Sequence, residues 1–467
     1  MNNEYETPAS INTFVTQHEV PLGGQMNNTQ QLVKAEVVLL EDKQGVEDKQ
    51  GAVQVFFASN SIFELSTLCQ LLNRELVPLG NEKIEKIKGK YQIGEFPALD
   101  NYLDMQTYID HRLLEVDDLY IYNGSRDQVV LLKDKAKLVC NDKSQIIDTC
   151  ADIKFCLPGS DLSILESDHL AINNAVDLFT SKRIKQRIEE TLEIPPLPET
   201  AQAIINLRMD PNADVNKLCK IVETDPSLAA QVVSWAGSSY YAAPGSVKSV
   251  QDAIVRVLGF ELVMNLSLGL SLGKTLDLPK DGPEAVTPYW VQSVYCATSM
   301  GSLASIIPRE FRPSFGLSYL SGLLHNFGYL ILAHSFKPQF INSCRLIDCN
   351  AHLESYIVEN HLMNVTREQM AHALMQAWHM PDEVCMALRH QNMPEYRGLH
   401  SDYAYMVYLT KQKLRQFGVI NGPILPIDPA IYELLHVTEE AVDEVFETIL
   451  ESKEELDAIA RGLGGGL

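Results

Sequence analysis

The spacing of hydrophobic and polar positions changes once along the chain. Near the start, Leu32–Leu40 and Ala52–Ser59 are apolar runs rich in β-branched and aromatic residues, and they flank the polar stretch EDKQGVEDKQG. This arrangement is typical of two strands joined by a long hairpin loop. Ser61–Asn73 then carries apolar residues three and four positions apart, which predicts a helix.

A second hairpin is indicated further along. Leu119–Tyr122 and Gln128–Leu132 bracket the turn sequence NGSRD. From about Gln145 the strand pattern stops, and helical periods continue to the end of the chain. The fold class we expect is therefore multidomain: an N-terminal α+β part with a mixed sheet and helices, followed by an all-α helical domain.

Local capping signals fix several helix starts in the second part. Asp214 and Asp225 each precede an amphipathic run, and Pro226 occupies the first helical position after Asp225. Ser249 begins another predicted helix, which Gly259 ends. Near the end of the chain, Thr438 is an N-cap followed by two glutamates in the first turn. These signals predict short, tightly packed helices.

The chain of 467 residues is too long for one hydrophobic core. We expect an N-terminal domain at 1–155, a linker with a charged connecting helix at 156–193, a helical domain at 194–410, and C-terminal helices at 411–467 packed on that domain. The segment EIPPLPET, with three prolines, ends the connecting helix. Because neither core needs the linker to close, the two parts are predicted to be separable there.

Composition places the chain among ordinary globular proteins, with 46% hydrophobic and 21% charged residues. The net charge is −23, with −9 in residues 1–150 and −14 in the remainder. DNA and other polyanions require a local excess of lysine and arginine, so bulk charge argues against a DNA partner.

We expect no membrane partner. The first ten residues lack the basic start and apolar run of a secretory signal. Leu262–Gly273 is too short to span a bilayer, and Gly316–Ala333 carries His325 and Asn326 in its middle, so both are predicted to be buried helices. Nine scattered cysteines without a CxxC pair indicate reduced thiols and a cytoplasmic location.

The helical part carries an ordered series of landmarks over about two hundred residues. They are LPxxxxxI from Leu197, Asp225–Pro226, the SxxY of Ser238–Tyr241, AIxxxLG at Ala253–Gly259, GLLHNFG at Gly322–Gly328 and WHMP at Trp378–Pro381. From about Ile194 to at least Leu409 the chain resembles the HDOD family, the HD-related output domains of bacterial signalling proteins. The resemblance implies a binding or output module that acts on a protein partner.

Catalytic HD proteins hold metal ions with a first histidine, an adjacent His-Asp pair and a distant aspartate. The resemblance places Gln292 at the first position, His325–Asn326 at the pair and Asp402 at the distant position, so that His325 and Asp402 remain as a vestigial metal site. His372 and His390 fall where metal-dependent relatives have further histidines. A neutral amide supplies no ligand charge, so we expect neither a cofactor nor phosphohydrolase activity. The alternative for His325 is a buried histidine that bonds a neighbouring helix.

The first part resembles the YbaK/ProX-type aminoacyl-tRNA deacylases over roughly residues 8–145. The resemblance rests on the VK of Val33–Lys34, the stretch FFASNSIFELSTLCQLL, the GEFP of Gly94–Pro97 and the stretch YIDHRLLEVDDLYIYNG. It implies that Lys34 contacts the substrate and that the loop from Gly94 to Pro97 shapes the pocket. In an active enzyme these would be the catalytic residues.

Two departures keep a second reading open. Family members follow the lysine with threonine or serine, whereas this chain has Ala35, and a domain of net charge −9 is a poor partner for tRNA. The N-terminal domain is therefore either a sensor of an amino-acid-like ligand or an aminoacyl-tRNA trans-editing deacylase regulated by the helical domain. A basic patch beside Lys34 would favour tRNA.

Overall fold

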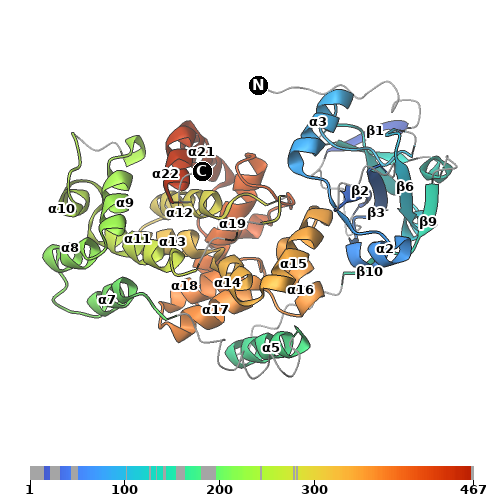
Figure 1. Cartoon of the computed structure of the whole chain (residues 1–467). Helices are drawn as coiled ribbons and strands as arrows, with labels where there is room; N and C mark the ends of the chain where they lie inside the picture. Colours follow the sequence, from blue (N-terminus) through green and yellow to red (C-terminus); the bar gives the residue numbers. More distant parts are fainter. Residues whose placement is uncertain are drawn as a thin grey trace. The chain divides into compact units, whose positions relative to one another are not determined.

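The structure is a computed structural model of the 467-residue chain. It describes residues 15–21, 32–43, 51–100, 102–125, 128–132, 134–139, 144–153, 164–179, 196–241, 245–276, 279, 282–284 and 286–463. The chain divides into two compact units (Figure 1). The first unit contains Met1–Phe155, Pro283–Ala285 and Ile341–His361, and the second contains the rest of the chain.

The first unit is built on a mixed eight-stranded sheet (Figure 1). The strand order is β1-β8-β7-β2-β3-β6-β9. The eighth strand, β5, pairs with the C-terminal end of β2. The strands are β1 (Val15–Pro21), β2 (Val33–Asp42), β3 (Val53–Ala58), β5 (Leu76–Pro78), β6 (Gln106–Asp110), β7 (Leu119–Tyr122), β8 (Gln128–Leu132) and β9 (Ser144–Ile147). A two-stranded sheet pairs β4 (Ser61–Phe63) with β10 (Cys150–Asp152).

Strand register separates the two faces of this sheet. In the antiparallel β2–β3 pair Glu36 lies opposite Phe57, and in the parallel β2–β7 pair Lys34 lies opposite Tyr120. Side chains alternate along a strand, so Lys34, Glu36 and Phe57 share one face. The other face carries a core that includes Ala35, Phe56, Ala58, Ile109, Leu119, Ile121 and Val130.

Short helices complete the first unit. They are α2 (Leu65–Leu72), α3 (Asn81–Tyr91), α4 (Arg112–Glu115) and the 3₁₀ turn η1 (Lys135–Leu138). Glu284, from a much later part of the sequence, accepts a hydrogen bond from the Asn81 backbone N–H, and its carbonyl oxygen accepts from Asn81 Nδ2 at 2.7 Å. A carboxylate at this helix start satisfies an otherwise unpaired amide.

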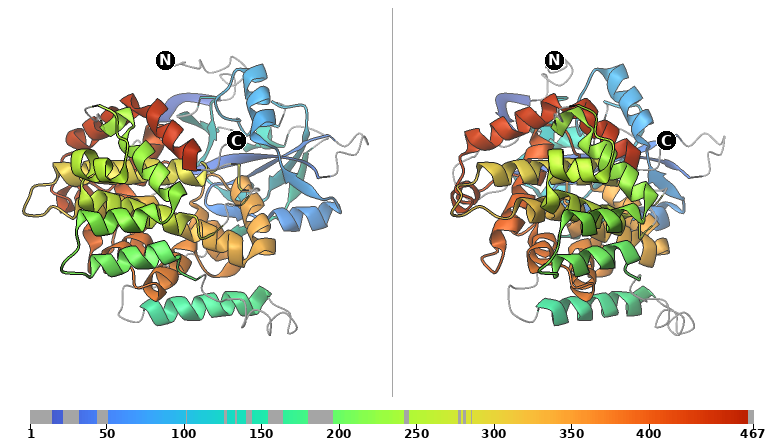
Figure 2. Two further views of the ribbon diagram at one scale, coloured as in Figure 1. Left: turned by 60° about the vertical axis from the view of Figure 1, so that its left-hand side comes forward. Right: turned by 90° about the vertical axis from the view of Figure 1, so that its left-hand side faces the viewer.

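The second unit is helical (Figures 1 and 2). Its elements up to residue 258 are α5 (Ile164–Phe179), α7 (Glu199–Arg208), α8 (Val215–Glu223), α9 (Pro226–Ala236), η2 (Ser239–Tyr241), α10 (Val250–Asp252) and η3 (Ala253–Leu258). The later ones are α11 (Phe260–Gly273), α12 (Tyr289–Ile306), α13 (Phe315–Leu324), α14 (Phe327–Ser335), α15 (Lys337–Cys349), α16 (Ser355–Met363), α17 (Arg367–Ala377), α18 (Asp382–His390), α19 (Ser401–Gln416), α20 (Pro429–Leu434), α21 (Glu439–Glu451) and α22 (Lys453–Leu463). Most of α15 and α16 falls in the segment Ile341–His361 that belongs to the first unit.

Helices α12 and α13 pack closely at the centre of the second unit. A Cβ atom added at Gly322 would lie 2.7 Å from both the Ala297 Cα and the Cys296 carbonyl oxygen. The two backbones can approach this closely only because Gly322 has no side chain. This glycine opens the GLLHNFG stretch, and it allows the helix that ends just before His325 to pack closely on α12.

Several expectations from the sequence are confirmed. Asp214 accepts a hydrogen bond from Lys217 N, Asp225 accepts from Ser227 N and Leu228 N, and Thr438 accepts from Ala441 N, each at the start of its helix. Both long apolar stretches form buried helices, within α11 and across α13 and α14. Among the described helices, none is both long and apolar enough to cross a membrane.

Other expectations need correction. Strands continue past Gln145, because β9 extends to Ile147 and β10 follows it. Ser61–Phe63 is a strand paired with β10, so the helix begins only at Leu65. Within the expected linker α5 is an unforeseen helix, whereas the charged helix of residues 181–193 and most of the EDKQG loop lie outside the described residues.

Candidate functional site

His325 and Asn326 occupy the junction between α13 and α14, and both are buried. His325 Nδ1 lies 2.7 Å from the Gly322 carbonyl oxygen, one turn earlier. The His325 carbonyl oxygen accepts a hydrogen bond from Gln391 Nε2 at 2.7 Å. The ring is therefore held by its own helix, and the backbone at the junction is held by the end of α18.

The side chain of Asn326 accepts a hydrogen bond from a guanidinium group. Arg367 Nη1, at the start of α17, donates to Asn326 Oδ1 at 3.0 Å. A Cβ at Gly328 would overlap the Arg367 carbonyl oxygen, so glycine allows α14 to approach α17 this closely. In a catalytic HD protein the corresponding side chain would be a carboxylate bound to metal; here its oxygen is bound to a guanidinium.

The ammonium group of Lys411 also lies near His325. Lys411 Nζ, on α19, donates to Asn392 Oδ1 at 2.5 Å and lies 3.4 Å from Gln391 Oε1. Burial, together with the positive charges of Lys411, Arg367 and Arg415, lowers the pKa of His325 to about 3. The imidazole is therefore neutral at physiological pH. Asn326 supplies a neutral amide oxygen, already bound to Arg367, where a metal-dependent relative has a charged ligand.

His372 is held by a carboxylate that the sequence analysis did not single out. Its Nδ1 lies 3.2 Å from Asp168 Oδ2, on α5. The same buried carboxylate accepts from Arg389 Nε at 2.7 Å, Arg389 Nη2 at 3.0 Å and Gln369 Nε2 at 2.9 Å. Burial alone would raise the pKa of Asp168, but the bonds from His372 and Arg389 hold it below its usual value. No local pattern marks Asp168, because its partners lie about two hundred residues later.

His390 packs on an aromatic ring. It stacks on Tyr396 with centroids 3.7 Å apart and an interplanar angle of 7°, and its Nδ1 lies 3.1 Å from Met393 Sδ. Burial lowers its pKa to about 3, and the Arg389 charge adds to this effect. His390 is thus a neutral, buried ring.

The remaining predicted ligand positions, Asp402 and Gln292, make other contacts. Asp402 is in the first turn of α19, nine residues before Lys411 and so about 14 Å from it along the axis. Burial raises the pKa of Asp402, and its charged neighbours are His400 and Glu383. Gln292 donates to the Thr287 carbonyl oxygen. No contact among the described residues joins Asp402 to His325, and a vestigial metal site made of the two stays a prediction.

In the first unit, Lys34 lies among polar groups on one face of the sheet. Its Nζ is 3.4 Å from Tyr122 Oη and 3.9 Å from Glu36 Oε1, and its side chain is 23% exposed. The Lys34 backbone N–H donates to Ser59 Oγ at 2.9 Å. Burial raises the pKa of Glu36, while Lys34 and Tyr122 oppose the rise. A lysine and a half-buried carboxyl group therefore lie side by side.

The loop from Gly94 to Pro97 meets the same hairpin as Lys34. The Gly94 and Glu95 backbone N–H groups both point at the Gly124 carbonyl oxygen, at 2.7 and 3.4 Å. Gly124 follows β7, the strand that ends with Tyr122. The structure thus brings Lys34 and the Gly94–Pro97 loop to one hairpin. The described charged partner of Lys34 is acidic, and Lys88 near the loop is paired with Glu95 at 3.3 Å.

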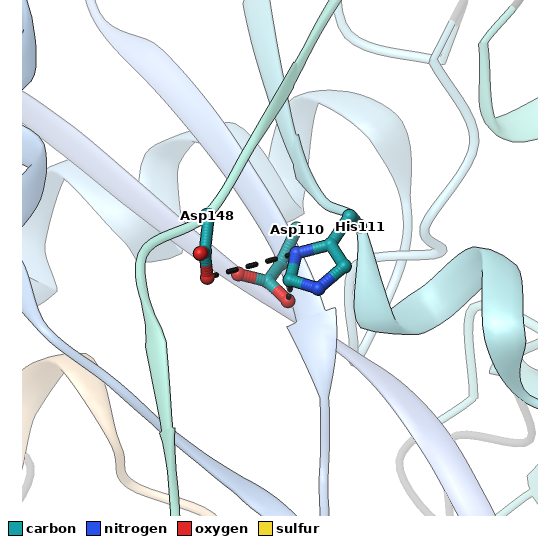
Figure 3. A group of neighbouring side chains, drawn as sticks. All are labelled: Asp110, His111 and Asp148. Carbon is teal, nitrogen blue, oxygen red and sulfur yellow. Dashed lines mark ion pairs between the residues drawn. The ribbon is translucent and has the colours of Figure 1, made fainter.

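One group of three potential metal ligands occurs among the described residues (Figure 3). Asp110, His111 and Asp148 lie together where β6 ends, with His111 Nδ1 3.9 Å from Asp110 Oδ1 and 3.6 Å from Asp148 Oδ1. The buried Asp110 accepts from the backbone N–H groups of Arg112, Thr149 and Cys150. Because its oxygens bind these amides, Asp110 serves to fix the chain between β9 and β10.

The fold and the helical junction define a class of protein that combines an α/β unit with an HD-type helical unit. The HDOD domain profile matches residues 194–394. A structure from Marinobacter aquaeolei VT8, described as a candidate signal transduction protein, is 39% identical, covers 97% of this chain and 98% of that one, and has a TM-score of 0.83. The chain belongs to the HDOD-domain family and has a signal-transduction homologue.

Two more distant relatives extend the comparison. An HDOD domain protein of unknown function from Geobacter sulfurreducens is 17% identical, covers 60% of this chain and 96% of that one, and has a TM-score of 0.48. An uncharacterised protein of Treponema pallidum (strain Nichols) is 21% identical over 238 residues, which are 50% of this chain and 45% of that protein. The match thus spans less than half of this curated relative.

Proposed function

We propose that this protein is a signal-transduction regulator whose HDOD domain binds a protein partner without catalysing a reaction. The observation that carries the proposal is the bond from Arg367 to Asn326, at 3.0 Å. At the position where a catalytic HD protein has a metal-binding carboxylate, this chain has the neutral amide of Asn326. That amide already accepts a hydrogen bond from the Arg367 guanidinium. Metal-dependent hydrolysis needs an ion that activates water, and the neutral Asn326 amide supplies no charge to bind one.

The N-terminal domain supplies the signal in this proposal. The Lys34 ammonium and the Glu36 carboxyl group lie 3.9 Å apart, next to the Tyr122 hydroxyl. Such a pair suits a small amino-acid-like ligand that carries both charges. Free thiols among the described residues include Cys69, Cys150 and Cys385, which supports a cytoplasmic location.

A second candidate function is aminoacyl-tRNA trans-editing by the N-terminal domain. It is favoured by the convergence of Lys34 and the Gly94–Pro97 loop on the β7–β8 hairpin. An ammonium there would hold the 3′ end of the tRNA, and the loop amides would position water. The acidic partner of Lys34 and the net charge of the domain weigh against tRNA and support the sensor.

A hydrolysis assay tests the proposed role of the HDOD domain. Purified full-length protein with Mn²⁺ or Mg²⁺ should hydrolyse neither cyclic dinucleotides nor nucleotides. The matched variant His325→Ala should be equally inactive. Turnover by the wild-type protein that disappears in His325→Ala would contradict the proposal.

A panel of mischarged tRNAs separates the two candidate functions of the N-terminal domain. If the sensor role is correct, the wild-type protein leaves the ester bonds intact, while amino acids and related small molecules bind in isothermal titration calorimetry. Deacylation that is lost in Lys34→Ala would instead favour trans-editing.

A further inference from the structure

A helical segment from the later half of the chain packs within the first unit. This segment, Ile341–His361, contains most of α15 and α16 and is called the α15–α16 segment below. It lies inside the range matched by the HDOD profile. The family region of the chain therefore contributes a piece to the domain that carries Lys34.

Asn350 anchors this segment to the edge of β4. Its Oδ1 accepts from the Phe63 backbone N–H at 2.8 Å, and its Nδ2 donates to the Phe63 carbonyl oxygen at 3.0 Å. The amide thus bonds both backbone groups of one residue, as a neighbouring strand would. Asn350 Nδ2 also donates to Leu346 O at 2.9 Å, which fixes its direction on α15. Asn350 is fully buried, so the anchor lies inside the packed interface between the segment and β4.

Two histidines extend the contact. His352 Nε2 lies 3.3 Å from the Ser61 carbonyl oxygen, and its ring meets Phe57 edge to face at 5.4 Å. His361 Nε2 lies 3.1 Å from Glu64 Oε1, just before α2. The segment therefore follows the chain from β3 through β4 to α2.

The face that His352 meets is the face that carries Lys34. Phe57, under the His352 ring, lies opposite Glu36 in the β2–β3 register, and Lys34 is two residues from Glu36 on the same side. Burial lowers the pKa of His352 to about 3, its contact with Ser61 opposes this, and the Lys34 charge adds to it. The ring is thus neutral and close enough to Lys34 to sense its charge.

We infer that the α15–α16 segment is a roof over the Lys34 face, so that a ligand must touch or displace it to reach the ammonium group. A ligand bound at the N-terminal site would then act directly on a segment of the HDOD region, and no separate linker helix would have to carry the signal. The inference gives the mode of regulation of the proposed sensor and rests on that proposed function for its biological meaning.

Chemical labelling of Lys34 tests the roof without a ligand. The full-length protein is acetylated with a low dose of an N-hydroxysuccinimide ester, and the labelling of Lys34 relative to Lys43 is measured by mass spectrometry. Lys43 has a side chain that is 50% exposed and serves as the internal reference. Asn350→Ala should raise the Lys34/Lys43 ratio about threefold or more, because local opening exposes groups in proportion to the open population.

The control is Asn342→Ala, which removes an exposed amide two helical turns earlier on α15 and should leave the ratio unchanged. An unchanged ratio in a folded Asn350→Ala protein would overturn the inference. If that variant does not fold, His352→Ala provides the same test with the Asn350 anchor intact. Failure to find a ligand would count against the proposed function and leave this result standing, whereas a ligand that binds without altering Lys34 labelling would count against the roof.

Discussion

Asp168 and Arg389 form a buried bidentate ion pair between α5 and α18, with Nε–Oδ2 and Nη2–Oδ1 distances of 2.7 and 3.0 Å. The neighbours of Asp168 on α5 are exposed, and Leu170 is 62% exposed. One carboxylate therefore supplies the main polar attachment of this helix to the described part of the HDOD domain.

The first prediction concerns this pair. Asp168→Asn should lower the free energy of unfolding by about 3 kcal/mol or more, because it leaves the buried Arg389 without its counter-charge. Asp210→Asn is the matched control, since Asp210 pairs with Lys217 at a partly exposed site and its loss should have a much smaller effect. Urea unfolding followed by circular dichroism measures both. Equal changes in the free energy of unfolding for the two substitutions would contradict the prediction.

The second prediction is a loss of stability in mild acid. His325 and His390 have pKa values of about 3 in the folded chain, below the unfolded value near 6.5. Between these values the unfolded state binds more protons, so stability falls as the pH drops through 6.5. From pH 7.5 to 5.5 each histidine should cost about 1 kcal/mol. Thermal unfolding across this range checks it, and a double variant with glutamine at both positions should flatten the dependence.

A separate acid effect is expected from Asp168. Its folded pKa lies below the ordinary value of an aspartate, so its contribution is present above that ordinary value and is lost as the pH falls through the lower, folded one. In Asp168→Asn the steep loss below about pH 4 should become shallower. A curve of the same steepness in the variant would rule out this assignment.

Lys34 is predicted to matter for ligand recognition and little for stability. Lys34→Ala should abolish ligand binding, or deacylation if the domain edits tRNA, while unfolding changes by less than about 1 kcal/mol, because its ion pair with Glu36 is long and partly exposed. Lys43→Ala is the control, since Lys43 pairs with Glu75 on the surface. Retained binding in Lys34→Ala would move the site elsewhere.

The fifth prediction concerns dissection of the chain. A fragment of residues 1–155 should unfold at lower denaturant concentration than the same unit in the whole protein, because Asn350 no longer satisfies Phe63. Limited trypsin digestion adds a second reading. Rapid cleavage at Lys182, Arg183 or Lys185 would indicate independent parts, and resistance there would indicate a docked connecting helix.

Local signals in the sequence predicted much of the fold, and the missing parts have a physical reason. The β2–β3 pair and the caps at Asp214 and Asp225 depend on residues close together in the chain. Strands β4 and β10 have three residues each, too few to establish a period of two, and the apolar Ile62 fits the helical spacing of the residues that follow it.

The candidate sites show the same limit. Sequence reasoning found His325, Asn326 and Lys34, because each belongs to a local motif. It assigned Asp402 as the second vestigial ligand beside His325, and this pairing stays a prediction; the Lys411 ammonium near His325 carries no local signal. Asp168 and Asn350 carry no local signal, since their partners are about 200 and 287 residues away along the chain.

The bond between Asn350 and Phe63 limits how freely this protein can be recombined. A chimera in which another helical domain replaces residues 194–410 would lose the amide that completes β4, and the sheet edge would be open to pairing with other chains. The segment Ile341–His361 should therefore be kept with the N-terminal domain when the helical domain is exchanged. A chimera that keeps Ile341–His361 should stay monodisperse, while one that lacks it should aggregate.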